Sequence, residues 1–518
     1  MLVSSSSDLT VTDTFSLGRY GEVLLSNGRR FVPTNLFAAG SPEAVALAAE
    51  NELNQITLDD GVNGQNPEVV VYPAGGLSAS NPLRSGDTVA ALTGVMDFSF
   101  SLYRIIPVEQ PTIVASNPRT DAPDLDLGNL KVASLNVLNY FNTLDVSPNL
   151  CGPSNLECRG ADSEEEFERQ RAKTLAALLA MDADIVGLME VENNGFGTSS
   201  AVGDLVSGLN DVLGANTYAV VDAGSAIGTD AITVALIYKP AVVSAIGDPA
   251  ILDSSNSISD DDGPLFLDTK NRPALNQKFA LTENNEELVI SVNHFKSKGS
   301  SCGAGDDDTT TGQGNCNLTR TRAAQALTTF LSEQFAETPK LIIGDLNAYA
   351  LEEPILKILE QGYTNLANKF GGDEAYSYSF GGEFGYLDHA LASAELVDKV
   401  VDTTEWHINA DEPIVFDYNV EFKSEQQQID YYAPDAYRMS DHDPVVISLL
   451  LESEVQVVEG DYDGDGDVDK FDIQALNADI RSGVASDMAF DFNGDGKLTI
   501  RDVLLMYRKC TRSRCAAN

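Results

Sequence analysis

The sequence is short of several features on which whole classes of protein depend. It has 33 lysines and arginines against 79 aspartates and glutamates, which gives a net charge of −46 at pH 7. Such a chain repels polyanions over long range, so nucleic-acid binding would require a local basic groove. No apolar run is long enough to cross a bilayer, which excludes a membrane-spanning helix. The acidity is typical of a salt-adapted or calcium-rich extracellular protein.

Zinc-type cysteine pairs and a leader sequence are also missing. The six cysteines fall into three close couples, namely Cys151/Cys158, Cys302/Cys316 and Cys510/Cys515. None has C-x2-C spacing, and local disulfide bonds in an oxidising compartment are the simplest interpretation. The start, MLVSSSSDLTVTDTF, lacks the basic segment and the apolar core of a signal peptide. We expect an extracellular or cell-surface protein whose natural start is missing or whose signal has been removed.

Composition divides the chain into regions. Residues 1–115 are predicted to be β-rich, because stretches such as EVVVYP and YGEVLLS alternate apolar and polar residues between Gly and Asn turns. Residues 116–128, rich in Pro and Asp, are predicted to be a linker. Strands and helices alternate over residues 129–452, where the helix SEEEFERQRAKTLAALLAM begins with a Ser-x-x-Glu capping box. Residues 453–518 form a further, calcium-type domain.

Polar side chains follow several of the expected strands. Glu190 ends ADIVGLME, His294 ends ELVISVNH, and Asp345 and Asn347 lie in KLIIGDLNA. Proteins that alternate helices and strands place their chemistry at such strand ends, so these residues are candidates for one site. Each also has a plainer explanation: a solvated strand end, a common exit from strand to loop or, in SDHDP, a turn with capped carboxylates.

Six motifs decide between these explanations. SLNVLN, GLMEVENN, SVNHFKS, IIGDLNAY, GYLDHALAS and MSDHDPV follow one another between residues 134 and 445. The set resembles the endonuclease/exonuclease/phosphatase (DNase I-like) superfamily, and the large secreted bacterial nucleases within it, over residues 1–452. The resemblance implies an α+β fold, a four-layer sandwich of two β-sheets flanked by helices. A partial, N-terminally incomplete OB-like β-region would precede it, and a small helical calcium-loop domain would follow.

The resemblance also implies how water and a metal ion are held. Phosphodiester hydrolysis needs charge stabilisation on phosphoryl oxygens and an activated water. Asn136, Glu190 and Asp441 would hold Mg²⁺ or Mn²⁺, with Glu190 as the principal ligand. Asp345 and Asn347 would position and deprotonate the attacking water and contact the phosphate.

Histidine is scarce, with four in the chain, and the resemblance gives roles to two of them. His442 would contact the phosphate and transfer protons, with Asp388 accepting a hydrogen bond from it and raising its pKa. His294 would be a second phosphate-binding or acid histidine, supported by Asp230. We expect Asp443 to cap the turn before the last strand. The other two, His389 and His407, are expected to be structural.

Basic side chains near these motifs are few. Arg272 matches a phosphate-contacting arginine of the family, and Lys296 and Arg320 would complete a positive rim for a phosphate backbone. Each is equally explained as a solvated basic residue. Three functions are compatible with the whole set. The first is a secreted nuclease that hydrolyses extracellular DNA, with RNA as a further candidate substrate. The second is a phosphatase or lipid phosphodiesterase on the same fold, and the third is a calcium-dependent binding or scaffold protein with an inactive catalytic domain.

Two repeats near the C-terminus have the spacing of EF-hand calcium loops, DYDGDGDVDKFD and DFNGDGKLTIRD. The expected calcium ligands are Asp461, Asp463, Asp465, Asp467, Asp469 and Asp472 in the first loop, and Asp491, Asn493, Asp495, Lys497, Thr499 and Asp502 in the second. Oxygen ligands at this spacing wrap one loop around one Ca²⁺. The loops resemble those of dockerin domains, which implies a possible protein partner.

Overall fold

The structure is a computed structural model that describes residues 1–452, 459–464, 466–511 and 515. The chain forms two compact units, Met1–Leu451 and Glu452–Asn518. Within the described ranges, no helix is both long and apolar enough to cross a membrane.

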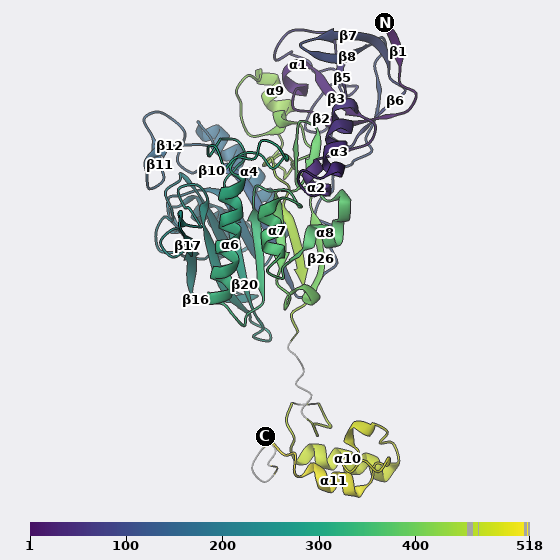
Figure 1. Ribbon diagram of the computed structural model, residues 1–518, viewed down its shortest axis with the longest axis vertical. Helices are drawn as coiled ribbons and strands as arrows, with labels where there is room; N and C mark the ends of the chain where they lie inside the picture. Colours follow the sequence, from purple (N-terminus) through teal and green to yellow (C-terminus); the bar gives the residue numbers. More distant parts are fainter. Residues whose placement is uncertain (453–458, 465, 512–514, 516–518) are drawn as a thin grey trace. The chain divides into compact units, whose positions relative to one another are not determined.

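Two six-stranded sheets form the centre of the first unit (Figure 1). Sheet 1 has the order β14-β15-β13-β10-β27-β26. Its strands are β10 (Leu130–Tyr140), β13 (Ile185–Glu192), β14 (Ala219–Val220), β15 (Ile232–Tyr238), β26 (Val400–Glu405) and β27 (Val445–Leu449). Sheet 2 has the order β16-β19-β20-β21-β25-β22. Its strands are β16 (Val243–Leu252), β19 (Arg272–Leu281), β20 (Glu287–His294), β21 (Lys340–Asp345), β22 (Thr364–Asn365) and β25 (Asp388–Ala392).

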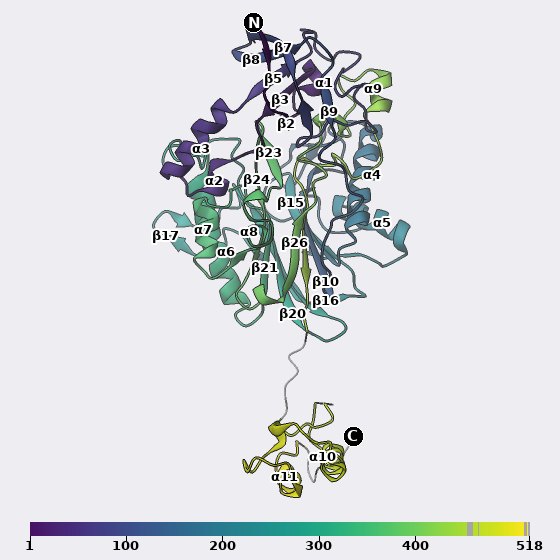
Figure 2. The ribbon, with the colours of Figure 1, turned by 90° about the vertical axis from the view of Figure 1, so that its right-hand side faces the viewer.

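Helices cover the outer faces of both sheets, which gives the four layers that the sequence predicted (Figures 1 and 2). The helices are α4 (Glu164–Met181) and α5 (Ala201–Leu213) on sheet 1, and α6 (Asn317–Gln334), α7 (Glu353–Leu359) and α8 (Leu366–Gly371) on the side of sheet 2. Helix α4 begins as predicted, since the Ser163 hydroxyl accepts a hydrogen bond from the Glu166 amide. The apolar faces of α6 and α7 pack with Val289 and Ile342 of sheet 2.

The two sheets pack face to face through a continuous apolar core drawn from β10, β13, β15, β20, β21 and β27. Gly187 of β13 shows how close they come, because a Cβ atom there would lie 2.7 Å from Ile343 and 2.8 Å from Val292 of sheet 2. A side chain at this position would push the sheets apart.

The N-terminal region is an eight-stranded sheet, with the order β1-β7-β8-β5-β3-β2-β6-β9. Its strands are β1 (Leu2–Ser4), β2 (Leu9–Asp13), β3 (Glu22–Ser26), β5 (Ile56–Asp59), β6 (Thr88–Ala90), β7 (Thr93–Ser99), β8 (Leu102–Pro107) and β9 (Thr112–Val114). Strands β2, β3 and β5 form an antiparallel meander, and β8 adds parallel to β5. Strands β6 and β7, which are consecutive in the chain, pair with β2 and β8 respectively and so extend the sheet on its two sides. The β-rich character predicted for residues 1–115 is thus confirmed, whereas the OB-like topology stays a prediction.

The N-terminal region is joined to the predicted catalytic region (residues 129–452) by a third sheet and by shared core residues. Strand β4 (Arg30–Phe31) pairs with the hairpin β23 (Tyr378–Phe380) and β24 (Glu383–Gly385). Phe416 and Tyr431, which flank α9 (Glu425–Asp430), lie in the N-terminal core. The short helices α1 (Leu17–Tyr20), α2 (Pro33–Leu36) and α3 (Pro42–Leu53) complete the region. The predicted linker is packed against the catalytic region rather than extended, as its Asn117 and Arg119 bind carboxylates there.

The second unit is a small helical pair, α10 (Lys470–Ser482) and α11 (Ile500–Met506). Its core contains Val468, Leu476, Val503 and Met506. Each helix begins at one of the two acidic loops, with Asp469 and Thr499 as the N-caps.

Candidate active site

Four of the expected site residues form one row across sheet 2. Arg272 pairs with His294, His294 with Asp345, and Asp345 with Asp388. Directly paired residues project from the same face of a sheet, so the four side chains are neighbours. All four are less than a tenth exposed. Because each lies at the end of its strand, the row forms one edge of the sheet, as expected for a site at strand ends.

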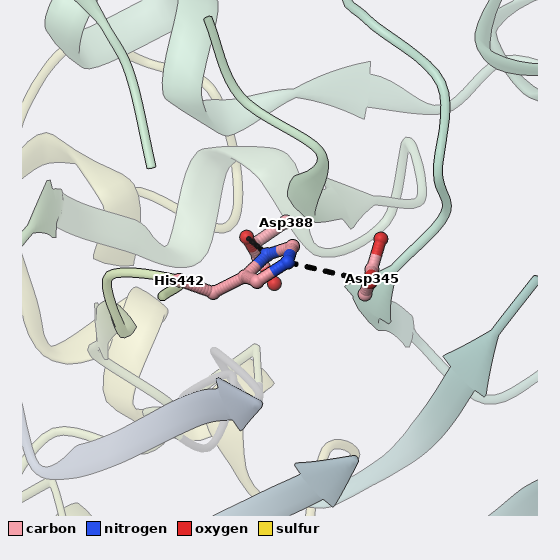
Figure 3. Close-up of side chains that lie close together, drawn as sticks. All are labelled: Asp345, Asp388 and His442. Carbon is pink, nitrogen blue, oxygen red and sulfur yellow. Dashed lines mark hydrogen bonds and ion pairs between the residues drawn. The ribbon is translucent and has the colours of Figure 1, made fainter. Parts of the chain in front are cut away.

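His442 joins this row from the segment before β27 (Figure 3). Its Nδ1 lies 2.7 Å from Oδ2 of Asp388, and the hydroxyl of Ser377 donates to the same oxygen at 2.7 Å. A carboxylate can only accept, so Nδ1 carries the proton and Nε2 faces the site, 3.9 Å from Asp345. Burial lowers the pKa of His442, but the charges of Asp388, Asp441 and Asp345 outweigh it and hold that pKa well above its usual range.

Asp345 is the buried acid at the centre. Burial, together with the charge of Asp388, raises the pKa of Asp345 to about 7 against the opposing charge of His442. Its Oδ1 accepts from the backbone amide of Asn347 at 2.9 Å, and its Oδ2 lies 3.5 Å from Nε2 of His294. Ligand atoms of Asp345, Asp388 and His442 lie within 4.8 Å of one another, but two of them are engaged in the Asp388–His442 hydrogen bond.

Sheet 1 contributes an oxygen-rich group to the same edge. The Asn136 amide donates to Oε1 of Glu190 at 3.3 Å, and that oxygen lies 4.0 Å from Nε2 of His294. Burial and the neighbouring charge of Asp441 raise the pKa of Glu190. Glu190 has φ of +64°, an uncommon backbone conformation that clusters at functional sites. The carboxylates of Glu190 and Asp441 and the amide oxygen of Asn136 are the hard oxygen ligands that suit a divalent ion such as Mg²⁺ or Mn²⁺.

The prediction that Asp230 supports His294 is wrong. The Asp230 carboxylate pairs with Arg159 at 3.1 Å and with Arg272 at 3.3 Å. Two nearby guanidinium groups compete better for a carboxylate than a neutral imidazole does. Nδ1 of His294 has no hydrogen-bond partner among the described residues. Burial and the positive charges of Arg272, His442 and Lys296 hold the pKa of His294 well below its usual range.

Arg320 does not belong to a positive rim. Its guanidinium is fully buried and donates to the backbone carbonyls of Gln313, Asn315 and Lys296. It therefore holds the backbone of the loop after His294 and is not available to contact a substrate. Lys296 remains half-exposed beside the row. With Arg159 and Arg272 it forms a local cluster of positive charge, in which both arginines pair with Asp230.

The remaining histidines have structural partners. His389 is fully buried, and its Nε2 lies 2.8 Å from the Ala348 carbonyl. His407 stacks on Tyr376, with ring centroids 3.9 Å apart, and its Nδ1 lies 2.9 Å from Asp443. Asp443 does not cap its own turn, because its other oxygen accepts from the amides of Asn409 and Ala410.

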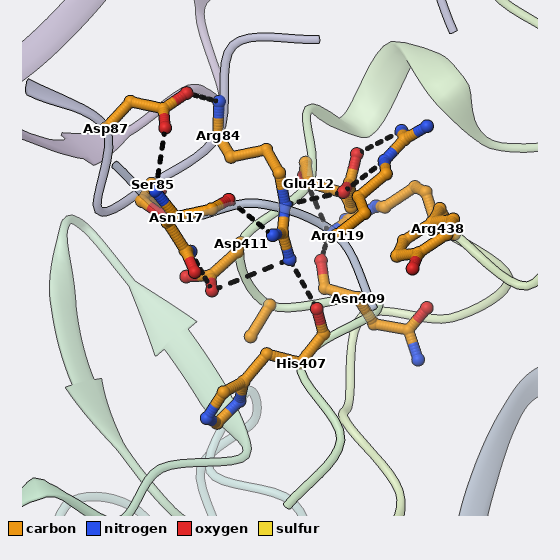
Figure 4. Close-up of polar contacts among 12 residues, drawn as sticks. Arg84, Ser85, Asp87, Asn117, Arg119, His407, Asn409, Asp411, Glu412 and Arg438 are labelled. Atoms are coloured by element: carbon orange, nitrogen blue, oxygen red, sulfur yellow. Dashed lines mark hydrogen bonds and ion pairs between the residues drawn. The ribbon is translucent and has the colours of Figure 1, made fainter. Parts of the chain in front are cut away.

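A network that the sequence did not predict holds the segment from His407 to Glu412 (Figure 4). Asn409 donates to the His442 carbonyl at 2.6 Å. Two residues later, Asp411 pairs with Arg29 at 3.0 Å, and Glu412 pairs with Arg84 at 2.7 Å and with Arg119 at 2.6 Å. Both carboxylates are fully buried, and all three arginines come from the first 119 residues. We call residues 407–413 the clamped loop.

Most of the expected calcium ligands have side-chain contacts within the two acidic loops of the second unit. Asp461, Asp463 and Asp472 offer ligand atoms within 4.8 Å of one another, as do Asp467, Asp469 and Asp472. In the second loop, Asp491 accepts from the amides of Gly494 and Gly496, and Asp502 accepts from Asn493 and Thr499. Asp495 accepts from Lys497. Asp465 lies outside the described residues. The clustered hard oxygens fit Ca²⁺.

The cysteines pair locally. Disulfide bonds join Cys151 to Cys158, Cys302 to Cys316 and Cys510 to Cys515. The middle bond closes the loop between β20 and α6, which carries Lys296.

Three regions of the chain match family models, and curated relatives match a short stretch of it. Residues 2–118 match a domain of unknown function, and residues 459–509 match the dockerin type I domain. Ulvan lyase, long isoform, from a Glaciecola species is 47% identical over 58 residues, 11% of this chain and 6% of that protein. The Pseudoalteromonas enzyme of the same name is 44% identical over 59 residues, again 11% and 6%. The chain thus spans a small part of these relatives.

Solved structures resemble 62% of this chain at low identity. The catalytic domain of human Nocturnin with bound sulfate is 16% identical with a TM-score of 0.37, covering 62% of this chain and 96% of that chain. An endonuclease/exonuclease/phosphatase family protein from Bacteroides thetaiotaomicron is 16% identical with a TM-score of 0.39, and the match covers 62% of this chain and 98% of that chain. Residues 133–442, more than half of this chain, match the endonuclease/exonuclease/phosphatase family. The chain therefore belongs to that family, whose members are phosphoester hydrolases, and carries a dockerin type I domain towards its C-terminus.

Proposed function

We propose that the protein is a secreted, divalent-metal-dependent nuclease that hydrolyses phosphodiester bonds of extracellular DNA. The observation that carries the proposal is the row Arg272–His294–Asp345–Asp388, completed by His442 and facing the oxygen donors of Glu190. It combines a buried acid, a protonated histidine and fixed positive charge at one strand edge. Phosphoryl transfer depends on such positioning and charge stabilisation.

In the proposed mechanism Asp345 accepts a proton from water, whose oxygen then forms a bond to phosphorus. A raised pKa of about 7 suits Asp345 to this role near neutral pH. Asn347 orients the water or the phosphate, and Arg272 balances charge on phosphoryl oxygen. A divalent ion held by Asn136, Glu190 and Asp441 would supply Lewis-acid stabilisation of the phosphate.

The bond from phosphorus to the leaving oxygen then breaks, and that oxygen takes a proton. His442 is the better donor, because its pKa is raised while the pKa of His294 is lowered. Asp388 keeps the His442 ring oriented and stabilises its charged form. Neutral His294 would contact phosphate through Nε2, which faces Asp345 and Glu190.

The test is hydrolysis of plasmid DNA with Mg²⁺ or Mn²⁺, compared between the natural chain and His442→Ala. We expect EDTA to abolish activity and the variant to lose roughly 10²–10⁴-fold in rate, as for loss of an acid catalyst. Full activity in His442→Ala would sink this mechanism. Cutting of closed circular DNA would identify endonuclease action.

Substrate class is decided by a panel of DNA, RNA, phosphate monoesters and a phospholipid diester at equal phosphate concentration. Faster turnover of monoesters or lipid would replace the nuclease proposal with a phosphatase or a lipid phosphodiesterase. Turnover of none of them would favour a calcium-dependent binding protein with an inactive catalytic domain.

We also propose an extracellular location and a protein partner for the dockerin domain. Disulfide bonds form and persist in oxidising compartments, and Ca²⁺ at the concentrations found outside cells fills loops of this type. Pull-down with cohesin domains, with and without Ca²⁺, tests the partner. Retention that does not depend on Ca²⁺ would count against it.

A further inference from the structure

A pocket opens where the N-terminal region meets the catalytic site. Its volume is about 430 Å³, within the roughly 300–1,000 Å³ of small-molecule sites. Its lining includes Asp13, Phe15, Tyr378, Phe380, Arg438 and Asp441. The ring of Tyr378 also stacks on His442, with centroids 4.6 Å apart. The pocket therefore adjoins the proposed catalytic residues directly.

Its wall is built by both regions. The hairpin β23–β24, which carries Tyr378 and Phe380, pairs with β4 of the N-terminal region. Arg30 of β4 donates to the Gly381 carbonyl at 2.7 Å. At Gly382, φ is +74°, and a Cβ atom would lie 2.6 Å from Arg30 and 2.8 Å from Leu24. The turn therefore packs against Arg30 of β4 and Leu24 of β3.

Two aromatic rings at this pocket are exposed to solvent without visible structural need. Phe15 is 67% exposed and Phe380 is 74% exposed. Exposed aromatic rings beside a phosphoester site provide surfaces on which bases stack, whatever the base sequence. The charged side chains of the lining are Asp13, Glu412 and Asp441 against Arg438, and Glu412 is already paired with Arg84 and Arg119. Carboxylates repel a second phosphate but accept hydrogen bonds from the amino groups of bases.

We propose that this pocket binds one unpaired nucleobase of a polynucleotide strand, next to the phosphate that is cleaved. The aromatic faces of Phe15, Tyr378 and Phe380 hold the base, and the phosphate backbone passes along Arg272 and Lys296. This proposal rests on the proposed nuclease function and extends it to strands whose bases are unpaired at the cleavage point.

The experiment compares kcat/KM on a single-stranded oligonucleotide with kcat/KM on bis(p-nitrophenyl) phosphate, which has no base. Variants are Phe15→Ala, Phe380→Ala and their combination in the full chain. Phe422→Ala is the control, since Phe422 is 84% exposed and lines a different pocket. We expect the ratio of the two values to fall roughly 5- to 100-fold in the pocket variants, the loss of one stacked base, and to stay unchanged in the control.

An oligonucleotide with a single abasic position supplies a second measurement. If the base sits in the pocket, the natural enzyme cleaves that strand more slowly beside the abasic position, and the double variant shows no added loss. An unchanged ratio in the double variant would overturn the subsite while leaving the nuclease function standing. An equal fall in the ratio for Phe422→Ala would overturn it too. Absence of diester cleavage by the natural enzyme would instead remove the nuclease function and the subsite with it.

Discussion

The chemical role of the hydrogen bond between Asp388 and His442 can be tested with a substitution that keeps the size of the side chain. Asp388→Asn keeps the shape of the side chain but removes the charge that raises the pKa of His442. We expect kcat to fall roughly 10²–10⁴-fold. Steady-state hydrolysis of DNA measures the effect, and thermal unfolding shows that the fold is intact. Asp398→Asn removes the same charge at an exposed position of the catalytic region, and equal losses in both variants would contradict the role.

At the scale of residues, the sequence predicted what lies within motifs and failed where charges compete. Asn136, Glu190, His294, Asp345, Asp388 and His442 gather at one edge, because each motif ends or begins a strand. Asp230 and Arg320 were misplaced because sequence distance does not reveal which charged neighbour wins. Ser377 and Arg159 were not predicted at all, since a single serine or arginine in a loop carries no pattern.

At the scale of elements, the clamped loop (residues 407–413) connects the N-terminal region to the backbone of His442. Arg84→Ala would leave Glu412 buried with one cation fewer. We expect a destabilisation of about 3–5 kcal/mol, the usual effect of breaking a buried pair, and a lower kcat. The single tryptophan, Trp406, reports unfolding of this interface in urea, because its indole donates to Thr120 at 3.0 Å.

Arg19→Ala provides the matched control for Arg84→Ala. Arg19 is exposed and donates to Gln65, so its removal should change the free energy of unfolding by less than about 0.5 kcal/mol. Equal urea midpoints for the two variants would show that the clamp contributes nothing. Local periodicity could not predict this loop, because its pairs join residues that are 293 to 382 positions apart in the sequence.

Helix α4 offers a pH-dependent measurement away from the catalytic residues. Burial raises the pKa of Glu166 from 4.5 to about 7, although it accepts from the amides of Val420 and Asp162. A raised pKa favours the folded state at low pH. The contribution is full below about pH 4.5 and is lost as pH rises towards 7. Glu166→Gln should flatten this loss in urea unfolding between these values, whereas exposed Glu165→Gln should retain it.

At the scale of the whole molecule, the two units should respond separately to calcium. Asp472→Ala with Asp502→Ala removes the position-12 carboxylates of both loops. Calcium at a thousandfold excess over its Kd stabilises a single-site domain by about 4 kcal/mol. We expect calorimetric titration to show this binding in the natural chain and not in the double variant, with DNA hydrolysis in Mg²⁺ unchanged. Asp487→Ala, which removes a carboxylate outside the loop positions, is the control, and loss of binding in it would contradict the assignment.

The order of the strands in sheet 1 has a consequence for biosynthesis. Strand β27 (Val445–Leu449) is the last strand of the catalytic region to be translated, yet it lies inside the sheet between β10 and β26. Domains fold as units while the ribosome is still adding residues, but this sheet has a gap until β27 arrives. A nascent chain therefore has no finished catalytic centre. The cell that makes this enzyme is exposed to its activity only after nearly the whole catalytic region has been synthesised.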